Sequence, residues 1–417
     1  MRRLLFVSHR LPYPPDKGER VRAFHEIRTL SRWFHVTVVA PAPPDASGPD
    51  LPDLPNVRWV PVPDGSISAF LRAGTRLLCG GAASQGHFDS RRLRRALRAA
   101  AADGAFDVAV AYCSSMVPAV LSAPAGARVA DVVDADSAKW AAYAEGAGPL
   151  RGWLYRREAA AVAELEARAA AEGDAVACVS EAELAAMGLS PGPRALAIGN
   201  GVDTDYFYAP LPDDSEPDRI VFTGTMDYRP NVDAVCWFAR EVLPDIRDAV
   251  PEASFTVVGR DPAPAVRQLA ARPGVEVTGS VPDVRPYLAR AAVAVCPLRL
   301  ARGVQNKVLE AMAMARPVVA SPAALEGLDA EPGRHVLQAD SAREFGEAVV
   351  GLLTNSALRA RMGDDARGHV ERHYTWDARL APLVDLCRRL AGCHEEPAAA
   401  ARRPKAAEVV GEEGRSS

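Results

Sequence analysis

The feature of this sequence that most constrains its fold is a repeated alternation of short apolar segments with segments of helical period. Apolar runs of this length, bounded by turn residues, are typical of strands buried in a parallel sheet. In the first half of the chain the predicted strands span 4–8, 35–41, 57–63, 106–112, 128–135 and 174–180. In the second half they span 219–224, 254–259, 275–279, 292–297 and 317–321. The pattern predicts an α/β protein with two doubly wound parallel sheets.

Helical segments separate these strands and continue beyond the last of them. They span 20–33, 67–79, 90–102, 150–172, 231–249, 262–271, 282–290, 305–315, 341–354, 356–372 and 376–392. The segment 208–218 is rich in Pro and Asp, which indicates a linker. We therefore divide the chain into a first domain (1–200), a second domain (201–375), a final helical segment (376–393) and a tail (394–417). The tail has no apolar period, which predicts disorder.

Composition and missing motifs exclude several functional classes. A net charge of −4 argues against a protein that binds nucleic acid through a global basic field. Seven cysteines without a CxxC pair indicate neither a zinc site nor a disulfide framework, and they fit a reducing cytoplasm. Neither half has GxGxxG after its first strand and no GxxxxGK[ST] occurs, which disfavours nicotinamide, flavin and P-loop enzymes. No run approaches the ~18 apolar residues of a membrane-spanning helix, so a soluble or peripheral protein is predicted.

The predicted architecture itself locates a binding site. Open α/β sheets bind ligands at the carboxyl ends of their strands, so two such sheets predict a cleft between them. Gly224, Gly259 and Gly279 each end a predicted strand. Glycine lets the backbone approach a ligand closely, although turn geometry alone would also select it.

Two stretches of the sequence resemble a known family. NGVDTDYF (200–207), preceded by VS at 179–180, resembles the inter-domain signature of glycosyltransferase family 4. KVLEAMAMARPVVAS (307–321) resembles the donor-site helix of that family and the strand that follows it. The resemblance implies the GT-B fold, with two Rossmann-like domains facing a cleft, and a retaining transfer of a hexose from a nucleotide-diphosphate sugar. It also implies no bound metal and no cofactor, and a final helix (376–392) that crosses back to brace the first domain.

Three further stretches are similar to a narrower subgroup. They are SHRLPYPPDKGERVRAFHEIRTL (8–30), GTMDYRPNVDAV (224–235) and DVVDADSAKW (131–140). The subgroup consists of bacterial sugar transferases associated with exosortase/PEP-CTERM exopolysaccharide clusters. This resemblance implies a glycan or lipid-linked glycan as acceptor.

The resemblance assigns the donor side to the second domain. Glu310 would accept hydrogen bonds from the ribose hydroxyls of the donor, since a carboxylate can accept two at once. The alternative for Glu310 is an ordinary carboxylate on a helix surface. The preceding loop would face the diphosphate and the sugar, because N–H groups at a helix start favour anions. The remaining predicted donor-side residues are Gly303, Val304, Gln305 and Asn306 of that loop, the strand-end Gly224, Gly259 and Gly279, and Val281, which would border the base.

Two departures from the family pattern concern charge. Eight residues before the ribose Glu, the family usually carries a second Glu, and this chain has Arg302 instead. Directly after the glycine that ends the first strand of the second domain, relatives often carry an Arg, and this chain has Thr225. Because a diphosphate leaving group concentrates negative charge, some cation must stabilise it. Arg229, Arg302 and Lys307 are the candidates, and Arg302 and Lys307 are predicted to be catalytic. We hypothesise that Arg302 took over the phosphate role, since a guanidinium can contact two oxygens; an ion pair with a surface acid is the alternative.

The first domain supplies the predicted acceptor side. Gly18 follows the first strand, where relatives admit the acceptor and the donor phosphate, but a charged surface turn is an equal alternative. His9 ends that strand and is either a site residue or a structural histidine. Asp134 and Asp136 end the fifth strand and could orient a sugar hydroxyl or help to deprotonate the acceptor. Capping of the next helix by Asp136 or Ser137 is the alternative.

Two basic stretches could contact a membrane. PLRGWLYRRE begins at 149 and combines aromatic residues with arginines, and RRLRRALR (91–98) adds five arginines. Such residues on an amphipathic helix suit an anionic membrane surface, whereas a solvated helix face is the alternative. We therefore expect a cytoplasmic protein, peripheral at the inner face of the membrane, with no nucleic-acid partner. A nucleotide-sugar epimerase of the same fold and a degenerate, non-catalytic nucleotide-sugar-binding protein remain the rival functions.

Overall fold

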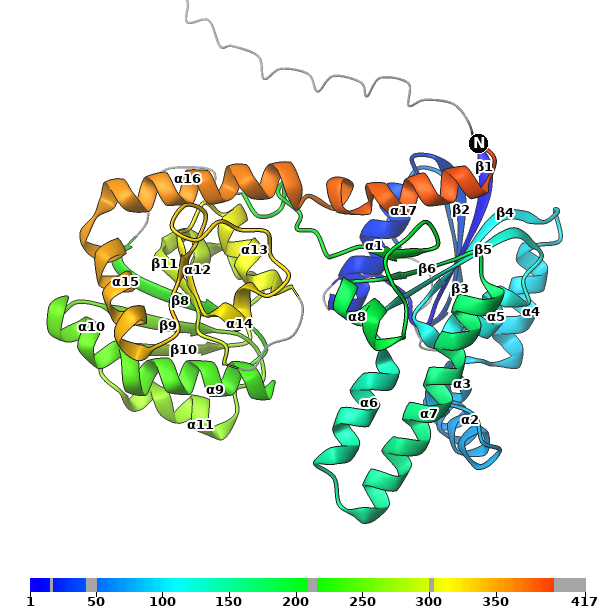
Figure 1. Ribbon diagram of the computed structural model, residues 1–417, viewed down its shortest axis with the longest axis horizontal. Helices are drawn as coiled ribbons and strands as arrows, with labels where there is room; N and C mark the ends of the chain where they lie inside the picture. The colour runs from blue at the N-terminus through cyan, green and yellow to red at the C-terminus, as the bar shows by residue number, and fades with distance from the viewer. Residues whose placement is uncertain (16–17, 43–50, 209–215, 300–303, 394–417) are drawn as a thin grey trace, which may run out of the picture.

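The computed structural model describes residues 1–15, 18–42, 51–208, 216–299 and 304–393. These residues form two α/β domains that lie side by side (Figure 1). Along one edge, the helix α16 (Ser356–His373) lies on the second domain and the helix α17 (Trp376–Leu390) lies on the first. The sequence predictions for Arg302, for Gly303 and for the tail 394–417 lie outside the described residues, as does most of the predicted linker 208–218.

The described part of the first domain contains a sheet of seven parallel strands in the order β3-β2-β1-β4-β5-β6-β7. The strands are β1 (Arg2–Ser8), β2 (Phe34–Ala42), β3 (Val57–Pro63), β4 (Phe106–Tyr112), β5 (Ala125–Val133), β6 (Ala175–Cys178) and β7 (Ala195–Ala197). The central strand β1 pairs with β2 on one side and β4 on the other, so that Leu4 lies opposite both Val36 and Val108. Strand order reverses at this point, which opens a crevice at the carboxyl ends of β1 and β4.

Helices cover both faces of this sheet (Figure 1). They are α1 (Gly18–Leu30), α2 (Ser66–Leu78), α3 (Ala83–Phe88), α4 (Arg91–Ala100), α5 (Val117–Leu121), α6 (Asp136–Glu145), α7 (Pro149–Glu172) and α8 (Glu181–Ala186). The helices α6 and α7 form an antiparallel pair that projects well beyond the sheet, next to α2. This projection makes the first domain longer than its sheet alone.

The second domain repeats the same plan in its described residues, with six parallel strands in the order β10-β9-β8-β11-β12-β13. The strands are β8 (Glu216–Thr223), β9 (Ser254–Val258), β10 (Val275–Gly279), β11 (Ala291–Cys296), β12 (Val318–Ala320) and β13 (Leu337–Gln338). Its helices are α9 (Arg229–Trp237), α10 (Leu243–Ala249), α11 (Pro264–Arg267), α12 (Arg285–Arg290), α13 (Asn306–Ala313), α14 (Pro322–Leu325), α15 (Ala342–Thr354) and α16 (Ser356–His373). Here the order reverses between β8 and β11. The prediction of two doubly wound parallel sheets is therefore confirmed.

The domains are joined by two adjacent crossings of the chain. Val202, on the outgoing crossing, forms a parallel bridge with Thr375 on the returning one. A Cβ atom at Gly201 would lie only 2.7 Å from the Cα of Trp376, so the close contact of the two crossings requires glycine there. The returning chain forms α17 (Trp376–Leu390), whose buried side chains belong to the same apolar cluster as those of α1 and β1.

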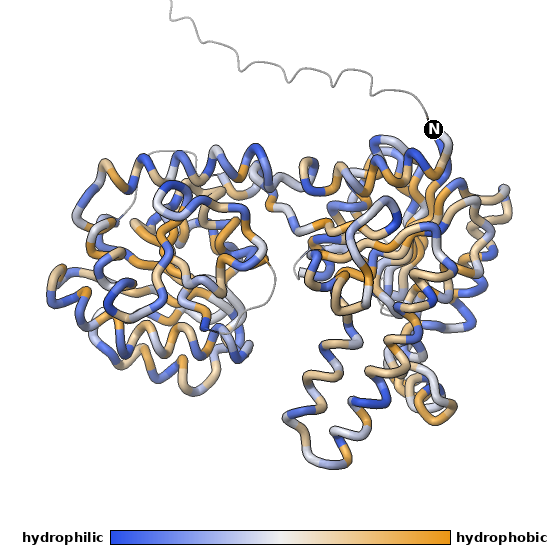
Figure 2. Tube along the Cα trace, in the orientation of Figure 1, coloured by the Kyte–Doolittle hydropathy of each residue, from blue (hydrophilic) through white to orange (hydrophobic). Residues whose placement is uncertain are grey.

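Successive side chains of a buried strand point to opposite faces of the sheet and therefore pack in different hydrophobic clusters. In β1, Leu4 and Phe6 pack in the cluster that includes α1 and α17, whereas Leu5 and Val7 pack in the cluster on the opposite face, against α4 and α7. A single larger cluster fills the second domain. Hydrophobic segments accordingly follow the strands in both domains (Figure 2).

Several predicted elements differ from those in the structure. The helix predicted over 231–249 is α9 and α10 with a π-helical turn between them, because Pro244 has no N–H to continue regular α-helical bonding. The helix predicted over 262–271 is α11 followed by a 3₁₀ turn, and the one predicted over 282–290 begins only at Arg285. The short elements β7, β13, α3, α5, α8 and α14 were not predicted, since they are too short to show a period.

Candidate functional site

The carboxyl ends of β1, β4 and β5 surround a cavity of about 420 Å³ in the first domain. His9 and Gly18 line it from the β1 side, and Asp134 and Asp136 line it from the end of β5. Val304 of the second domain also borders this cavity. Four residues that the sequence assigned to the acceptor side are therefore brought together.

Two strained residues mark the floor of this cavity. Cys113 follows β4 with a φ of 75°, and Val133 ends β5 with a φ of 67°. Positive φ is costly for any residue with a Cβ atom, and especially for a β-branched one. The strain at Val133 is offset by its N–H bond to the Asp131 carboxylate (3.0 Å) and at Cys113 by its N–H bond to the Asp131 carbonyl (2.8 Å). Strain held in this way is typical of functional sites.

A buried group of charges lies beneath the same strand ends. The guanidinium of Arg22 in α1 donates to Asp131 in β5 (2.7 Å) and forms an ion pair with Glu26 (2.8 Å). It also donates to the carbonyl of Ile198 (2.7 Å) and to the side chain of Asn200 (3.2 Å), at the start of the inter-domain crossing.

Burial strongly affects the ionisation of this group. The pKa of Arg22 is raised, because the attraction of Asp131 and Glu26 outweighs the desolvation that would lower it. The pKa of Glu26 is raised, first by burial and then by the neighbouring Asp131 carboxylate. Sequence reasoning missed these residues, since Arg22 and Asp131 are separated by 109 positions.

Asp134 lies on the wall of the cavity with a charged neighbour on either side. Its pKa is raised, first by desolvation and then by the nearby Glu183 carboxylate, while Lys139 acts in the opposite direction. Glu183 in turn accepts the N–H of Ala135 (2.7 Å) and so holds the turn that presents Asp134. A carboxyl group with a raised pKa in a cleft is suited to receive a proton or orient a hydroxyl.

Asp136 and Ser137 do not cap the following helix. Ala135 is the N-cap residue of α6, and no side chain makes a cap hydrogen bond there. Asp136 instead accepts from the hydroxyl of Ser114 (3.3 Å), and the N–H and hydroxyl of Ser137 both donate to Glu166 in α7. The capping alternative is therefore wrong, because Glu166 takes the role of satisfying the start of α6.

His9 and Glu19 form a second polar pair in the cavity. Glu19 accepts from Arg10 (2.7 Å), and His9 Nε2 lies 3.8 Å from the Glu19 carboxylate. The interaction with His9 and the charge of Arg10 lower the pKa of Glu19 to about 2 despite its partial burial. His9 Nδ1 is buried without a hydrogen-bond partner among the described residues.

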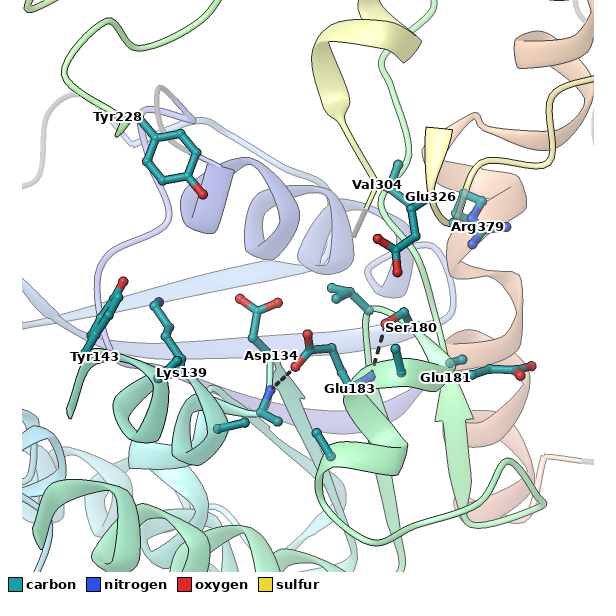
Figure 3. Close-up of a pocket in the computed structure, with 18 residues that line it drawn as sticks. Asp134, Lys139, Tyr143, Ser180, Glu181, Glu183, Tyr228, Val304, Glu326 and Arg379 are labelled. Carbon is teal, nitrogen blue, oxygen red and sulfur yellow. Dashed lines mark hydrogen bonds between the residues drawn. The ribbon is translucent and has the colours of Figure 1, made fainter. Parts of the chain in front are cut away.

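A larger cavity of about 1,040 Å³ lies between the domains. Asp134, Lys139 and Tyr143 line it from the first domain, and Tyr228 and Glu326 line it from the second. The carboxylates of Asp134 and Glu326 point into it from opposite domains (Figure 3). Val304 lines both this cavity and the smaller one, so the two adjoin at that residue.

The second domain gathers four polar groups at the carboxyl end of β8. The ammonium group of Lys307 donates to Asn231 (2.6 Å), and the amide of Asn231 donates to the carbonyl of Thr225 (2.9 Å). The pKa of Lys307 is lowered by its burial. Burial raises the pKa of Glu310, one turn further along α13, to about 7, with Lys307 opposing that shift. Asn231, which holds Lys307, was not predicted, because it lies 76 positions away in the sequence.

Close contacts within the second domain require glycine at two of the three strand ends, whereas a Cβ atom at Gly279 would meet nothing within 4 Å. A Cβ atom at Gly259 would lie 1.6 Å from the carbonyl oxygen of Gly224, and one at Gly224 would lie 2.7 Å from the Asn231 amide. Gly224 and Gly259 both have a φ of 156°, and Gly279 has a φ of 71°. These contacts alone explain why Gly224 and Gly259 are glycines, so close approach of a ligand is not needed to explain them.

The remaining predicted donor-side residues are more dispersed. Gln305 is the N-cap residue of α13, and the Oδ1 atom of Asn306 is buried without a partner among the described residues. Val281 is half-buried against the core of the second domain, and Arg229 is exposed at the start of α9. None of these four lines the cavity between the domains in the described part of the chain.

Solved structures resemble the whole chain. Sucrose-phosphate synthase (tll1590) from Thermosynechococcus elongatus has a TM-score of 0.69 at 17% identity, covering 94% of this chain and 100% of its own. WaaG, a glycosyltransferase involved in lipopolysaccharide biosynthesis, has a TM-score of 0.63 at 18% identity, covering 93% and 100%. Alr3699/HepE from Anabaena, in complex with UDP and glucose, has a TM-score of 0.61 at 12% identity, covering 92% and 99%. The chain has the GT-B fold. A comparison with curated proteins gives no significant match.

The second domain also matches a sequence family. Residues 217–355 match the family model of group 1 glycosyl transferases. The matched region extends from β8 to the end of α15 and so contains the cluster of Asn231, Lys307 and Glu310. The narrower resemblance to exopolysaccharide transferases stays a prediction.

Among the described residues, no group of three or more His, Cys, Asp and Glu side chains is placed to hold a metal ion. None of the helices in the described part of the chain has the length and apolar character needed to cross a bilayer.

Proposed function

We propose that this protein is a retaining glycosyltransferase that moves a hexose from a nucleotide-diphosphate sugar to a glycan or lipid-linked glycan. The observation that carries the proposal is the cluster of Lys307, Asn231 and Glu310 at the switch point of a group 1 glycosyltransferase domain. A cation can neutralise a diphosphate, and a carboxylate one turn away can accept hydrogen bonds from the attached ribose. The proposed pathway is bacterial exopolysaccharide biosynthesis, on the strength of the subgroup resemblance.

On the donor side, each polar group has a distinct task. The Glu310 carboxylate accepts hydrogen bonds from the two ribose hydroxyls when it is ionised. The Lys307 ammonium, released from Asn231 or shared with it, neutralises the diphosphate as the leaving group departs. Arg302, which lies outside the described residues, is proposed from the sequence to supply a second cation. The charge on the diphosphate is thus met by side chains, and the reaction that we propose is independent of metal.

On the acceptor side, the carboxylates of the first domain position the incoming hydroxyl. The bond between the anomeric carbon and the diphosphate oxygen breaks on the same face on which the acceptor oxygen attaches, so the anomeric configuration is retained. The proton of the acceptor hydroxyl passes to the departing phosphate oxygen. Asp134 orients that hydroxyl, and Asp136 fixes the neighbouring Ser114 and Lys139. Closure of the domains excludes water, which would otherwise hydrolyse the donor.

The proposal places the protein in the cytoplasm, peripheral at the inner face of the membrane. All seven cysteines lie in the described part of the chain and are free, which fits a reducing compartment. No cofactor is proposed, since the nucleotide sugar is a substrate.

The proposal is tested by sugar transfer from labelled donors. Uridine-diphosphate sugars are tried first, because the similar Anabaena structure holds UDP and glucose, followed by guanosine and adenosine analogues. We expect one donor class to be consumed only when a glycan acceptor is present, with the configuration of the anomeric carbon preserved in the product by NMR. An inverted product would contradict the retaining mechanism, and an epimerised sugar formed without acceptor would show an epimerase instead.

A further inference from the structure

We propose that α2 docks this protein on an anionic lipid bilayer by inserting its apolar face. The helix is amphipathic, but its polarity is opposite to that of an ordinary surface helix, because its apolar side faces solvent. Ile67, Phe70, Leu71 and Leu78 are between 69% and 84% exposed. They recur at helical spacing and therefore form one stripe. A monomeric soluble protein gains nothing from such a stripe unless it contacts an apolar partner.

The side of α2 that faces the protein carries both of its arginines beside the small, buried Ala69. Arg72 donates to the carbonyls of Gly86 (3.3 Å) and His87 (2.7 Å) and to the carboxylate of Asp64 (3.2 Å). Arg76 donates to the buried amide of Gln85 (3.0 Å). These bonds fix the rotation of α2 about its axis and hold the apolar stripe outward.

A second exposed apolar group continues this surface. Leu150 and Trp153, near the start of α7, are 73% and 50% exposed. Arg157 connects the two helices, since it donates to the Leu77 carbonyl (3.0 Å) and lies over the Trp153 ring. In Figure 1, α2 and the free ends of α6 and α7 project from the same end of the first domain. The stripe on α2 and the start of α7 thus form one surface, called here the docking surface.

Charge on the docking surface favours an anionic bilayer as the partner. The apolar stripe of α2 carries no acidic residue, and the two arginines of this helix are bonded to the protein, so the charge beside the stripe comes from α7. The first ten residues of α7 contain Arg151, Arg156 and Arg157 and one acid, Glu158, which is buried and accepts the N–H groups of Ala83 and Ser84. Exposed apolar side chains flanked by arginines suit the headgroup region of anionic lipids.

A second copy of this chain fits the docking surface less well. A helix of 13 residues is about 20 Å long and about 10 Å wide, so one face of α2 offers roughly 200 Å². A stable protein interface needs about 800 Å² from each partner. The α2 part of the docking surface therefore offers about a quarter of the area that a stable dimer needs from each partner, whereas insertion into lipid has no such minimum.

The position of α2 also relates the bilayer to the acceptor site. Ile67 and Leu71 line a cavity of about 1,020 Å³ that also contains His9, Arg10 and Phe88. The last three residues line the acceptor-side cavity as well. A bilayer at α2 would therefore present lipid-linked glycans at the mouth of a path to Asp134, a consequence that rests on the proposed function. The other basic stretch of the sequence, in α4, buries Leu93 and Leu97 and exposes its five arginines but no large apolar side chain.

Vesicle co-sedimentation of the full chain, without any sugar substrate, tests the proposal. The vesicles contain phosphatidylcholine alone or phosphatidylcholine with phosphatidylglycerol. We expect binding to the mixed vesicles, weakened by high salt, and a loss of roughly tenfold or more in affinity for Phe70→Ser/Leu78→Ser. Arg151→Glu/Arg156→Glu should weaken binding to the mixed vesicles in the same direction. The matched controls on the second domain, Tyr208→Ser and Arg272→Glu/Arg361→Glu, should bind as the natural chain does.

A measurement on the unsubstituted chain provides an independent readout. Cys79 adjoins Leu78 and is the exposed member of the seven free cysteines, all of which are described. A polarity-sensitive fluorophore on Cys79 should shift to the blue when mixed vesicles are added. The proposal is overturned if the natural chain does not bind the mixed vesicles, or if it binds them as well after Phe70→Ser/Leu78→Ser. It is also overturned if analytical ultracentrifugation shows that the natural chain is a dimer and that those substitutions dissociate it. None of these outcomes depends on donor binding, so a failure of this proposal can be distinguished from a failure of the proposed function.

Discussion

The two sheets of this protein share one topology, but their carboxyl edges are stabilised in different ways. The edge of the first sheet rests on buried charges, with Arg22 between Asp131 and Glu26, and opens into wide cavities. The edge of the second sheet is closed by backbone contact, with Gly259 against Gly224 and Lys307 held by Asn231. A fixed, compact edge suits a donor whose diphosphate is always the same. An open edge lined by carboxylates suits an acceptor whose shape varies.

The largest effect is expected at the buried charges of the first domain. Arg22→Met leaves Asp131 and Glu26 buried without their cation and should destabilise the fold by roughly 3–5 kcal/mol. The matched control is Arg168→Met, which breaks an exposed pair with Glu172 and should cost less than about 1 kcal/mol. Urea denaturation of both variants measures the difference. Equal stabilities would show that the first edge does not depend on its buried charges.

The second edge should be the more sensitive to added side-chain volume. Gly259→Ala forces a Cβ atom against the Gly224 carbonyl and should destabilise the fold by roughly 3 kcal/mol. At the first edge, a Cβ atom at Gly18 meets nothing within 4 Å, so Gly18→Ala should change stability by less than about 0.5 kcal/mol. Thermal unfolding checks both substitutions, and a stable Gly259→Ala variant would contradict the contrast between the edges.

A separation of roles between the edges is expected in the kinetics. Asp134→Asn removes a carboxylate from the acceptor side and should lower kcat by roughly 100-fold, the lower end of the typical contribution of an acid–base group, because Asp134 is proposed to orient the hydroxyl. The affinity for nucleotide should not change, because Asp134 belongs to the other domain. Glu181→Gln, at an exposed position in the same inter-domain cavity, serves as the control. A weaker nucleotide affinity in Asp134→Asn would show that the donor also depends on the first edge.

The smallest effect is a pH dependence that belongs to the second edge alone. Glu310 has a pKa of about 7, so its carboxylate is mostly ionised at pH 8 and mostly protonated at pH 6. If only the ionised form accepts both ribose hydrogen bonds, the nucleotide Kd should rise about tenfold from pH 8 to pH 6. Titrations of nucleotide binding at the two pH values measure this change. Glu310→Gln should abolish it, and a slope that persists in Glu310→Gln would place the titrating group elsewhere.

The sequence predicts the sheets better than it predicts their edges. The strands over 57–63, 106–112 and 275–279 have the same bounds in the structure, because each is an apolar run that ends at turn residues. The short helix α3 and the two-residue β13 carry no period and were missed. Their positions depend on contacts made elsewhere, such as Glu158 of α7 holding the start of α3.

The candidate site is only partly readable from the sequence for a similar reason. Motif resemblance points to Lys307 and Glu310, which the structure places in one cluster. Asn231 and Arg22 were missed because their partners lie 76 and 109 positions away, where no local pattern can indicate the contact. The outward stripe of α2 was also missed. The apolar periodicity of a helix shows that it has two different faces, but it does not show which face packs against the rest of the protein.

The central claim, that the second edge binds a nucleotide diphosphate through Glu310, is tested most directly by calorimetry. Isothermal titration with the diphosphate of the active donor compares the natural chain with Glu310→Gln at pH 8. Loss of a carboxylate that accepts two hydrogen bonds should raise Kd roughly 100-fold, whereas Glu347→Gln, at an exposed carboxylate on α15, should leave Kd unchanged. Equal Kd values for the natural chain and Glu310→Gln would contradict the account.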